Sequence, residues 1–263
     1  MRYFLKFAYR GTEFHGSQSQ PCGGTVQDVM ESGMATLLRC PTPLTFAGRT
    51  DAGVHAEVMY AHFDYEGEAF DLRSAEERKQ LVYRLNRILP KSIAIEDVLP
   101  TTNEAHARFD AISRTYKYRI TSKKDPFGYE LRTQVRPGLD FAAMNRAAAC
   151  LLGKQDFSSF CKVHTDVKTK ICDVMHAEWI CENEAEATFV ITADRFLRNM
   201  VRAVVGTLFE VGYGMISEEQ FAEIIRHQDR RKAGESADAQ GLYLVDIEYP
   251  STIFTPIIPN NAR

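Results

Sequence analysis

The sequence predicts an α+β protein in which two ferredoxin-like halves, each with the order β-α-β-β-α-β, form a joined antiparallel sheet with a central cleft. Three observations lead to this prediction. RYFLKFAY (2–9) places apolar residues at every second position, as a strand does. TVQDVMESGMATLL (25–38) repeats its apolar residues at helical spacing. The order of such segments follows the ferredoxin-like pattern in the N-terminal half and again in the C-terminal half.

The rest of the N-terminal half is predicted to be one helix and three strands. The helix covers 74–89, opens with a capping box of Ser74 and Glu77, and ends before Pro90. The strands are predicted over 44–48, 57–64 and 92–98.

The C-terminal half repeats this pattern of elements without repeating the sequence. A helix is expected over 140–152, beginning at Asp140 and ending at Gly153, followed later by a long helix over about 195–211 and a short one over 217–227. Strands are expected over 114–121, about 171–181, 186–193 and 242–249. We place the N-terminal half at 1–105 and the C-terminal half at 106–263, and a cleft at such a junction is a usual ligand site.

Composition excludes several classes of protein. Of the 263 residues, 44% are hydrophobic and 25% charged, which is typical of a globular chain with enough apolar material for two cores. No apolar run approaches the ~18 residues of a membrane span, and no signal-peptide cleavage site is visible, so a cytoplasmic protein is expected. The six cysteines form no CxxC and the seven histidines no HExxH, so neither a metal nor a disulfide is expected.

Charge is distributed unevenly along a chain whose net charge is -3. Six Lys or Arg residues fall in 108–124 against one acid. Arg195, Arg198 and Arg202 have the spacing i, i+3 and i+7, which would align them along one side of the predicted long helix. Such segregation can build a phosphate-binding groove on an acidic protein. The alternative is an ordinary solvated helix face.

The loop predicted between two strands, FAGRTDAGVHA (46–56), is a candidate for chemistry. Asp followed by a small residue and Gly is a common turn signal, which favours a structural role for Asp51. However, the loop is longer than a hairpin needs and presents Arg49, Thr50, Asp51 and His55 together. A reactive carboxylate in a partly buried site needs a cationic partner, and Arg202 is the better candidate for it.

The predicted strand RTYKYRIT (114–121) places Tyr116 and Tyr118 on one face. Tyrosines on a sheet usually pack in the core, but beside a basic face they can also stack on RNA bases. No GxxxxGK[ST], GxGxxG or GxSxG motif is present. Nucleotide hydrolysis, dinucleotide redox chemistry and α/β-hydrolase chemistry are therefore disfavoured.

Six segments taken together resemble, in the same order, blocks of the tRNA pseudouridine synthase A family. They are YRGTEFHGSQSQP (9–21), TVQ (25–27), GRTDAGVHA (48–56), RTYKY (114–118), MVRAVVG (200–206) and GLYLVDIEY (241–249). The chain departs from the family pattern at Arg10, where Asp is usual, at Ser17, where Trp is usual, and at Asp238, where Pro is common. These departures concern RNA contact and packing near the C-terminus.

The resemblance implies the pseudouridine synthase fold and the isomerisation of uridine to pseudouridine at positions 38 to 40 of the tRNA anticodon stem-loop. It implies no cofactor or metal, a homodimer, and no membrane association. Asp51 would attack the ribose C1' or the uracil C6, and Arg202 would pair with it. Tyr116 would pack on the target base and can help to remove its C5 proton, while Arg49 would associate with the flipped-out nucleotide. Flipping costs a few kcal/mol, which contacts to phosphate and base would offset.

Two other functions are compatible with some of these features. A non-catalytic RNA-binding protein built from ferredoxin-like modules would explain the basic segments and the tyrosines, but not the long loop around Asp51. A different carboxylate-based enzyme acting on a small nucleotide would explain the loop, but it would not require the basic segments.

Overall fold

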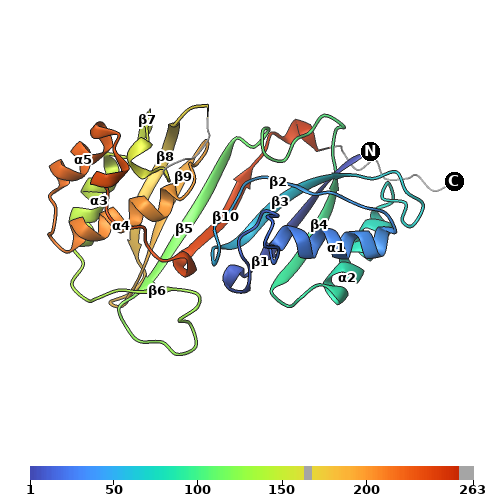
Figure 1. Cartoon of the computed structure of the whole chain (residues 1–263), viewed down its shortest axis with the longest axis horizontal. Coiled ribbons are helices and arrows are strands. Elements are labelled where there is room, and N and C mark those ends of the chain that lie inside the picture. The colour runs from blue at the N-terminus through green and yellow to red at the C-terminus, as the bar shows by residue number, and fades with distance from the viewer. Residues whose placement is uncertain (163–167, 255–263) are drawn as a thin grey trace. The chain divides into compact units, whose positions relative to one another are not determined.

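Helices and strands are interspersed along the chain in the computed structural model, which describes residues 1–162 and 168–254 (Figure 1). The predicted α+β class is confirmed. The chain divides into a first unit, Met1–Ile112 with residues 247–254, and a second unit, Ser113–Asp246. No helix in the described part of the chain is long and apolar enough to cross a membrane.

The first unit has the order β-α-β-β-α-β. Its strands are β1 (Arg2–Tyr9), β2 (Thr45–Phe46), β3 (His55–Asp64) and β4 (Ile93–Pro100), and its helices are α1 (Val26–Leu38) and α2 (Ala75–Ile88). The strands lie in the order β4-β1-β3-β2, and all three neighbouring pairs are antiparallel. The two helices pack beside each other, and α2 contacts β4 (Figure 1).

The second unit contains the same order of helices and strands with three additions, two short strands and one helix. Its strands are β5 (Ser113–Thr121), β6 (Thr133–Gln134), β7 (Gly153–Asp156), β8 (Ile171–Cys181), β9 (Glu186–Ala193) and β10 (Leu242–Glu248). Its helices are α3 (Phe141–Ala149), α4 (Met200–Gly212) and α5 (Glu218–His227). The sheet has the order β10-β5-β9-β8-β7, with the short β6 parallel to β5. The sequence analysis missed β6 and β7, which are only two and four residues long.

Short 3-10 turns complete the structure in both units. They cover Gly11–Glu13, Ser158–Phe160, Arg230–Lys232, Ala239–Gly241 and Ser251–Ile253.

The long helix begins later than predicted, which changes the interpretation of the arginines. Asn199 precedes α4 with a left-handed φ of 65°, so the residues before it are not helical. Arg195 and Arg198 therefore lie in the segment before the helix, and only Arg202 lies on α4. The predicted stripe of three arginines along one helix is wrong. The helix was predicted to begin too early because Leu197 fits the helical spacing of apolar residues. Leu197 is indeed buried, but it lies before the helix.

The predicted capping box of α2 is also wrong. Ser74 occupies the N-cap position, but its side chain makes no capping hydrogen bond. In the first turn of this helix Arg78 is buried, and its guanidinium donates hydrogen bonds to the carbonyl oxygens of Leu72 and Arg73 at 2.8 and 3.0 Å. A capping box does form at α1, between Thr25 and Asp28.

Several predicted boundaries shift by one to three residues; the strand predicted over 44–48 covers only Thr45–Phe46, and the one predicted over 92–98 covers Ile93–Pro100. Helix α3 is capped by Asp140 as expected, but it ends at Ala149, three residues before the predicted end. Strand β3 begins at His55, so the end of the GRTDAGVHA motif belongs to the strand.

Candidate active site

Asp51 lies in a tight turn between β2 and β3, and its side chain is half-buried. Its carbonyl oxygen accepts a hydrogen bond from the N–H of Val54 at 3.2 Å. Gly53 has a φ of 79°, which L side chains rarely adopt, so glycine is needed to close this turn. The turn signal in the sequence was therefore correct, and it presents Asp51 at the margin of the buried core.

Thr50 fixes the chain on one side of Asp51. Its side chain is buried, and its hydroxyl lies 2.7 Å from the hydroxyl of Tyr9 on β1. Its main-chain N–H and carbonyl both bond to Ser17. Sequence reasoning did not identify Tyr9 or Ser17 as parts of this arrangement, because they lie 41 and 33 residues away in the chain.

His55 fixes the chain on the other side. Its ring is buried, and its Nδ1 accepts a hydrogen bond at 3.0 Å from the N–H of Gly11. That nitrogen therefore carries no proton, and the bond sets the tautomer and orientation of the ring. Gly11 is required here, because a Cβ on it would lie 2.0 Å from the carbonyl oxygen of Val54.

The four polar residues that the sequence presented together thus differ in their surroundings. Thr50 and His55 are buried and hold the loop. Arg49 is exposed and Asp51 is half-buried. Of these four polar residues, Asp51 and Arg49 are therefore the two that solvent reaches.

The two tyrosines of β5 also differ. Tyr118 is fully buried, its hydroxyl donates to the carbonyl of Asp238 at 2.9 Å, and it lies 2.7 Å from the hydroxyl of Thr133. Burial raises the pKa of Tyr118 well above its usual value. Tyr116 is only half-buried, and its ring meets Phe196 edge-on at 5.0 Å between centroids. Tyr118 is therefore structural, and Tyr116 is the tyrosine that a ligand can reach.

Arg202 is half-buried on α4, and the segment before β10 fixes it. Its Nε donates to the carbonyl oxygen of Ala237 at 2.7 Å, and its own carbonyl accepts from the N–H of Ala237 at 2.9 Å. The guanidinium thus has a defined direction.

The three departures from the family pattern have different surroundings. Arg10 is exposed and pairs with Glu13 at 3.1 Å. Asp238 contributes its main-chain carbonyl to Tyr118, and its φ of -58° is one that proline also adopts. Ser17 is fully buried beside Thr50. Ser17 contacts the loop that carries Asp51, through the main chain of Thr50.

The candidate residues come from both units of the chain. Asp51 and Arg49 belong to the first unit, and Tyr116 and Arg202 belong to the second. Their assembly into one site is a prediction from the sequence.

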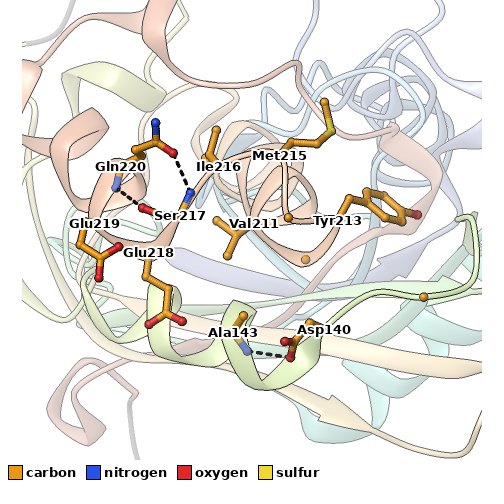
Figure 2. A pocket seen from close by; sticks show the side chains of 13 residues that line it. Asp140, Ala143, Val211, Tyr213, Met215, Ile216, Ser217, Glu218, Glu219 and Gln220 are labelled. Carbon is orange, nitrogen blue, oxygen red and sulfur yellow. Dashed lines mark hydrogen bonds between the residues drawn. The ribbon is translucent and has the colours of Figure 1, made fainter.

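A pocket of about 760 Å³ in the second unit contains none of these residues. Figure 2 shows that Asp140, Glu218 and Glu219 place carboxylates around it. The polar groups also serve the helix ends: Asp140 accepts from the N–H of Ala143, and Ser217 caps α5. Glu218 also pairs with Arg146 at 2.6 Å, so the polar groups here are engaged in helix capping and an ion pair, and we assign this pocket a structural origin. Within 1–162 and 168–254, no cluster of His, Cys, Asp or Glu could hold a metal ion.

The fold is consistent with that of a pseudouridine synthase, and comparison with known proteins identifies the family. The family model for tRNA pseudouridine synthase matches residues 147–250. A Bacteroides fragilis protein named tRNA pseudouridine synthase A is 53% identical over 253 residues, which cover 96% of this chain and 98% of that protein. A protein of the same name from Parabacteroides distasonis is 51% identical, over 96% of this chain and 98% of its own length. Another from Staphylococcus saprophyticus is 34% identical, over 94% of this chain and 90% of its own length. The chain belongs to the tRNA pseudouridine synthase A family.

Proposed function

We propose that this chain isomerises uridine to pseudouridine at positions 38 to 40 of the tRNA anticodon stem-loop, with Asp51 as the nucleophile. One observation carries the assignment to Asp51. It is the half-buried carboxylate in a turn whose two sides are fixed by the buried side chains of Thr50 and His55. Family membership supports the reaction, since the relatives are named for it.

The chemistry suits a carboxylate that acts without a cofactor. The N1–C1' bond breaks, a C5–C1' bond forms, the C5 proton leaves, and N1 gains a proton, so no oxidant or reductant is consumed. Attack by Asp51 at C1' would displace N1 and hold the ribose covalently, whereas attack at C6 would hold the uracil covalently, while the base turns. We therefore propose that neither a cofactor nor a metal ion takes part.

The other candidate residues receive roles that match their surroundings. The contact from Arg202 Nε to the carbonyl of Ala237 uses one of the five N–H donors of the side chain and orients the guanidinium. We assign its terminal nitrogens to hydrogen bonds with the Asp51 carboxylate. Tyr116, supported edge-on by Phe196, would pack on the target base. The exposed Arg49 would contact the flipped-out nucleotide.

The partners follow from the same proposal. The substrate is tRNA, and its anticodon arm must present a base that has left the stack. We infer a homodimer, as the family resemblance suggests, and the cytoplasm as the compartment in which the chain meets tRNA. Basic residues such as Lys123 and Lys124, both exposed, would contribute phosphate contacts.

The first test is the release of tritium from tRNA that carries [5-³H]uridine. The unmodified protein should release tritium, and Asp51→Ala should release none while still binding tRNA in a filter assay. Asp71→Ala is a matched control, because Asp71 is an exposed aspartate of the same unit that pairs with Arg73 on the surface. Activity retained by Asp51→Ala would refute the assignment of the nucleophile.

A second test addresses the position of the modified uridine. Carbodiimide labelling and primer extension on a tRNA transcript treated with the protein should map pseudouridine to positions 38 to 40. Pseudouridine formed only in another arm would refute the anticodon assignment and leave the isomerase activity intact.

A further inference from the structure

We propose that Ser17 is a positioning residue for Asp51, holding the peptide groups of Thr50 so that the carboxylate is presented in one orientation. The inference rests on the proposed function of Asp51, and it concerns a residue that never touches the substrate. It starts from a buried contact between two segments of the first unit.

Ser17 engages both main-chain polar groups of Thr50. The Thr50 N–H donates to Ser17 Oγ at 2.8 Å, and the Ser17 N–H donates to the Thr50 carbonyl at 3.2 Å. That carbonyl belongs to the peptide group that joins Thr50 to Asp51. One residue therefore holds the peptide group on each side of Thr50, including the one from which Asp51 continues.

The first turn of α1 fixes Ser17 in turn. Its carbonyl accepts from the N–H of Gln27 at 3.0 Å, and the carbonyl of Gly16 accepts from the N–H of Val26 at 3.2 Å. These two donors are among the four that a helix leaves without intrahelical partners at its N-terminus. The capping box of Thr25 holds the same turn in place. A rigid element therefore supports the serine.

Close packing leaves this segment little room to move. Ser17 has 0% exposed surface and Thr50 has 8%. Gly16 has a φ of 97°, and a Cβ on it would lie 3.0 Å from the carbonyl oxygen of Thr50. The contact is thus a direct backbone-to-backbone approach, and the hydroxyl of Ser17 is the side-chain group that completes it.

Loss of the hydroxyl would leave the buried N–H of Thr50 without its acceptor. A buried donor in that state favours movement of the chain toward water or toward another acceptor. Movement of Thr50 shifts Asp51, the next residue. Because a misplacement of about 1 Å can reduce a rate by up to about a hundredfold, the effect should appear in turnover rather than in tRNA binding.

The experiment compares Ser17→Ala with Ser159→Ala. Ser159 in the second unit is also 0% exposed, and its hydroxyl donates to the carbonyl of Ile224. Both variants therefore lose one buried serine hydroxyl. Tritium release is measured with saturating tRNA and below KM, at a temperature at which circular dichroism shows both variants folded.

We expect Ser17→Ala to lower kcat at least tenfold with KM changed less than twofold, and Ser159→Ala to keep kcat within twofold. Equal kcat values for the two alanine variants, or a Ser17→Ala effect confined to KM, would overturn the proposal. An inactive unmodified protein would instead overturn the proposed function, so the two failures are distinguishable.

If Ser17→Ala does not fold, Tyr9→Phe tests the same anchor. It removes the hydroxyl that lies 2.7 Å from that of Thr50, and phenylalanine fits the same buried space. A fall in kcat with unchanged KM would support the proposal, and an unchanged kcat would overturn it.

Discussion

Gly11→Ala is expected to damage both stability and turnover, because Gly11 lies against the loop that carries Asp51. The added Cβ would be 2.0 Å from the carbonyl oxygen of Val54, where real Cβ atoms essentially never come within 3.0 Å. The two backbones must therefore separate by about 1 Å. Neither atom belongs to a flexible side chain that could turn aside.

The cost has two parts. Overpacking a well-packed site costs about 1–3 kcal/mol. Separation also weakens the buried bond from the Gly11 N–H to His55 Nδ1, and an unsatisfied buried donor costs about 1–3 kcal/mol. We expect the free energy of unfolding to fall by about 2–6 kcal/mol, the sum of the two parts. Turnover of the folded fraction should fall by up to about a hundredfold.

Urea unfolding followed by circular dichroism measures the first effect, and tritium release at a temperature at which the variant is folded measures the second. Gly48→Ala is the stability control, since a Cβ there meets nothing within 4 Å and Gly48 has no left-handed φ. The reasoning fails if Gly11→Ala unfolds within about 0.5 kcal/mol of the unmodified protein and turns over at the same rate.

Three further predictions concern features outside this contact. Ser74→Ala should change the free energy of unfolding by less than about 0.5 kcal/mol, whereas Thr25→Ala should lower it by about 1 kcal/mol. The reason is that, of these two N-cap residues, only Thr25 makes a capping hydrogen bond with its side chain. Equal losses of stability in urea unfolding would contradict this prediction. Burial lowers the pKa of His62 to about 4, so stability should be full above about pH 6.5 and fall between about 6.5 and 4. His62→Gln should flatten that decline in Tm, and an unaltered pH dependence would refute the assignment. Asp238→Pro should leave Tm unchanged or raise it, since φ is already -58°; a fall of several degrees would show that the residue cannot accommodate proline.

The elements that could be predicted from the sequence are those defined by local pattern. Alternation in β1 and the helical period of α1 concern neighbours a few residues apart, so the sequence predicts them well. The start of α4 could not be predicted in this way. Leu197 is buried like a helical position, while the left-handed backbone of Asn199 breaks the helix after it. The spacing of apolar residues indicates which positions are buried. It does not distinguish a helix from a non-helical segment whose side chain is also buried.

The site shows the same division between local and distant information. The GRTDAGVHA motif identified Asp51, and Gly53 in its turn has the left-handed φ that an Asp-x-Gly signal predicts. The residues that hold the loop are Ser17, Tyr9 and Gly11, which lie 33, 41 and 44 positions from their partners. Only the pairing of strands and the packing of α1 bring them to the loop, so no spacing in the sequence reveals them.

The most direct test of the central claim is single-turnover conversion of tRNA by Asp51→Asn. This substitution keeps the size of the side chain and removes its charge, and an excess of enzyme ensures that binding does not limit the rate. We predict no tritium release from [5-³H]uridine tRNA by the variant, with full release by the unmodified protein under the same conditions. Conversion by Asp51→Asn at the rate of the unmodified protein would contradict the account.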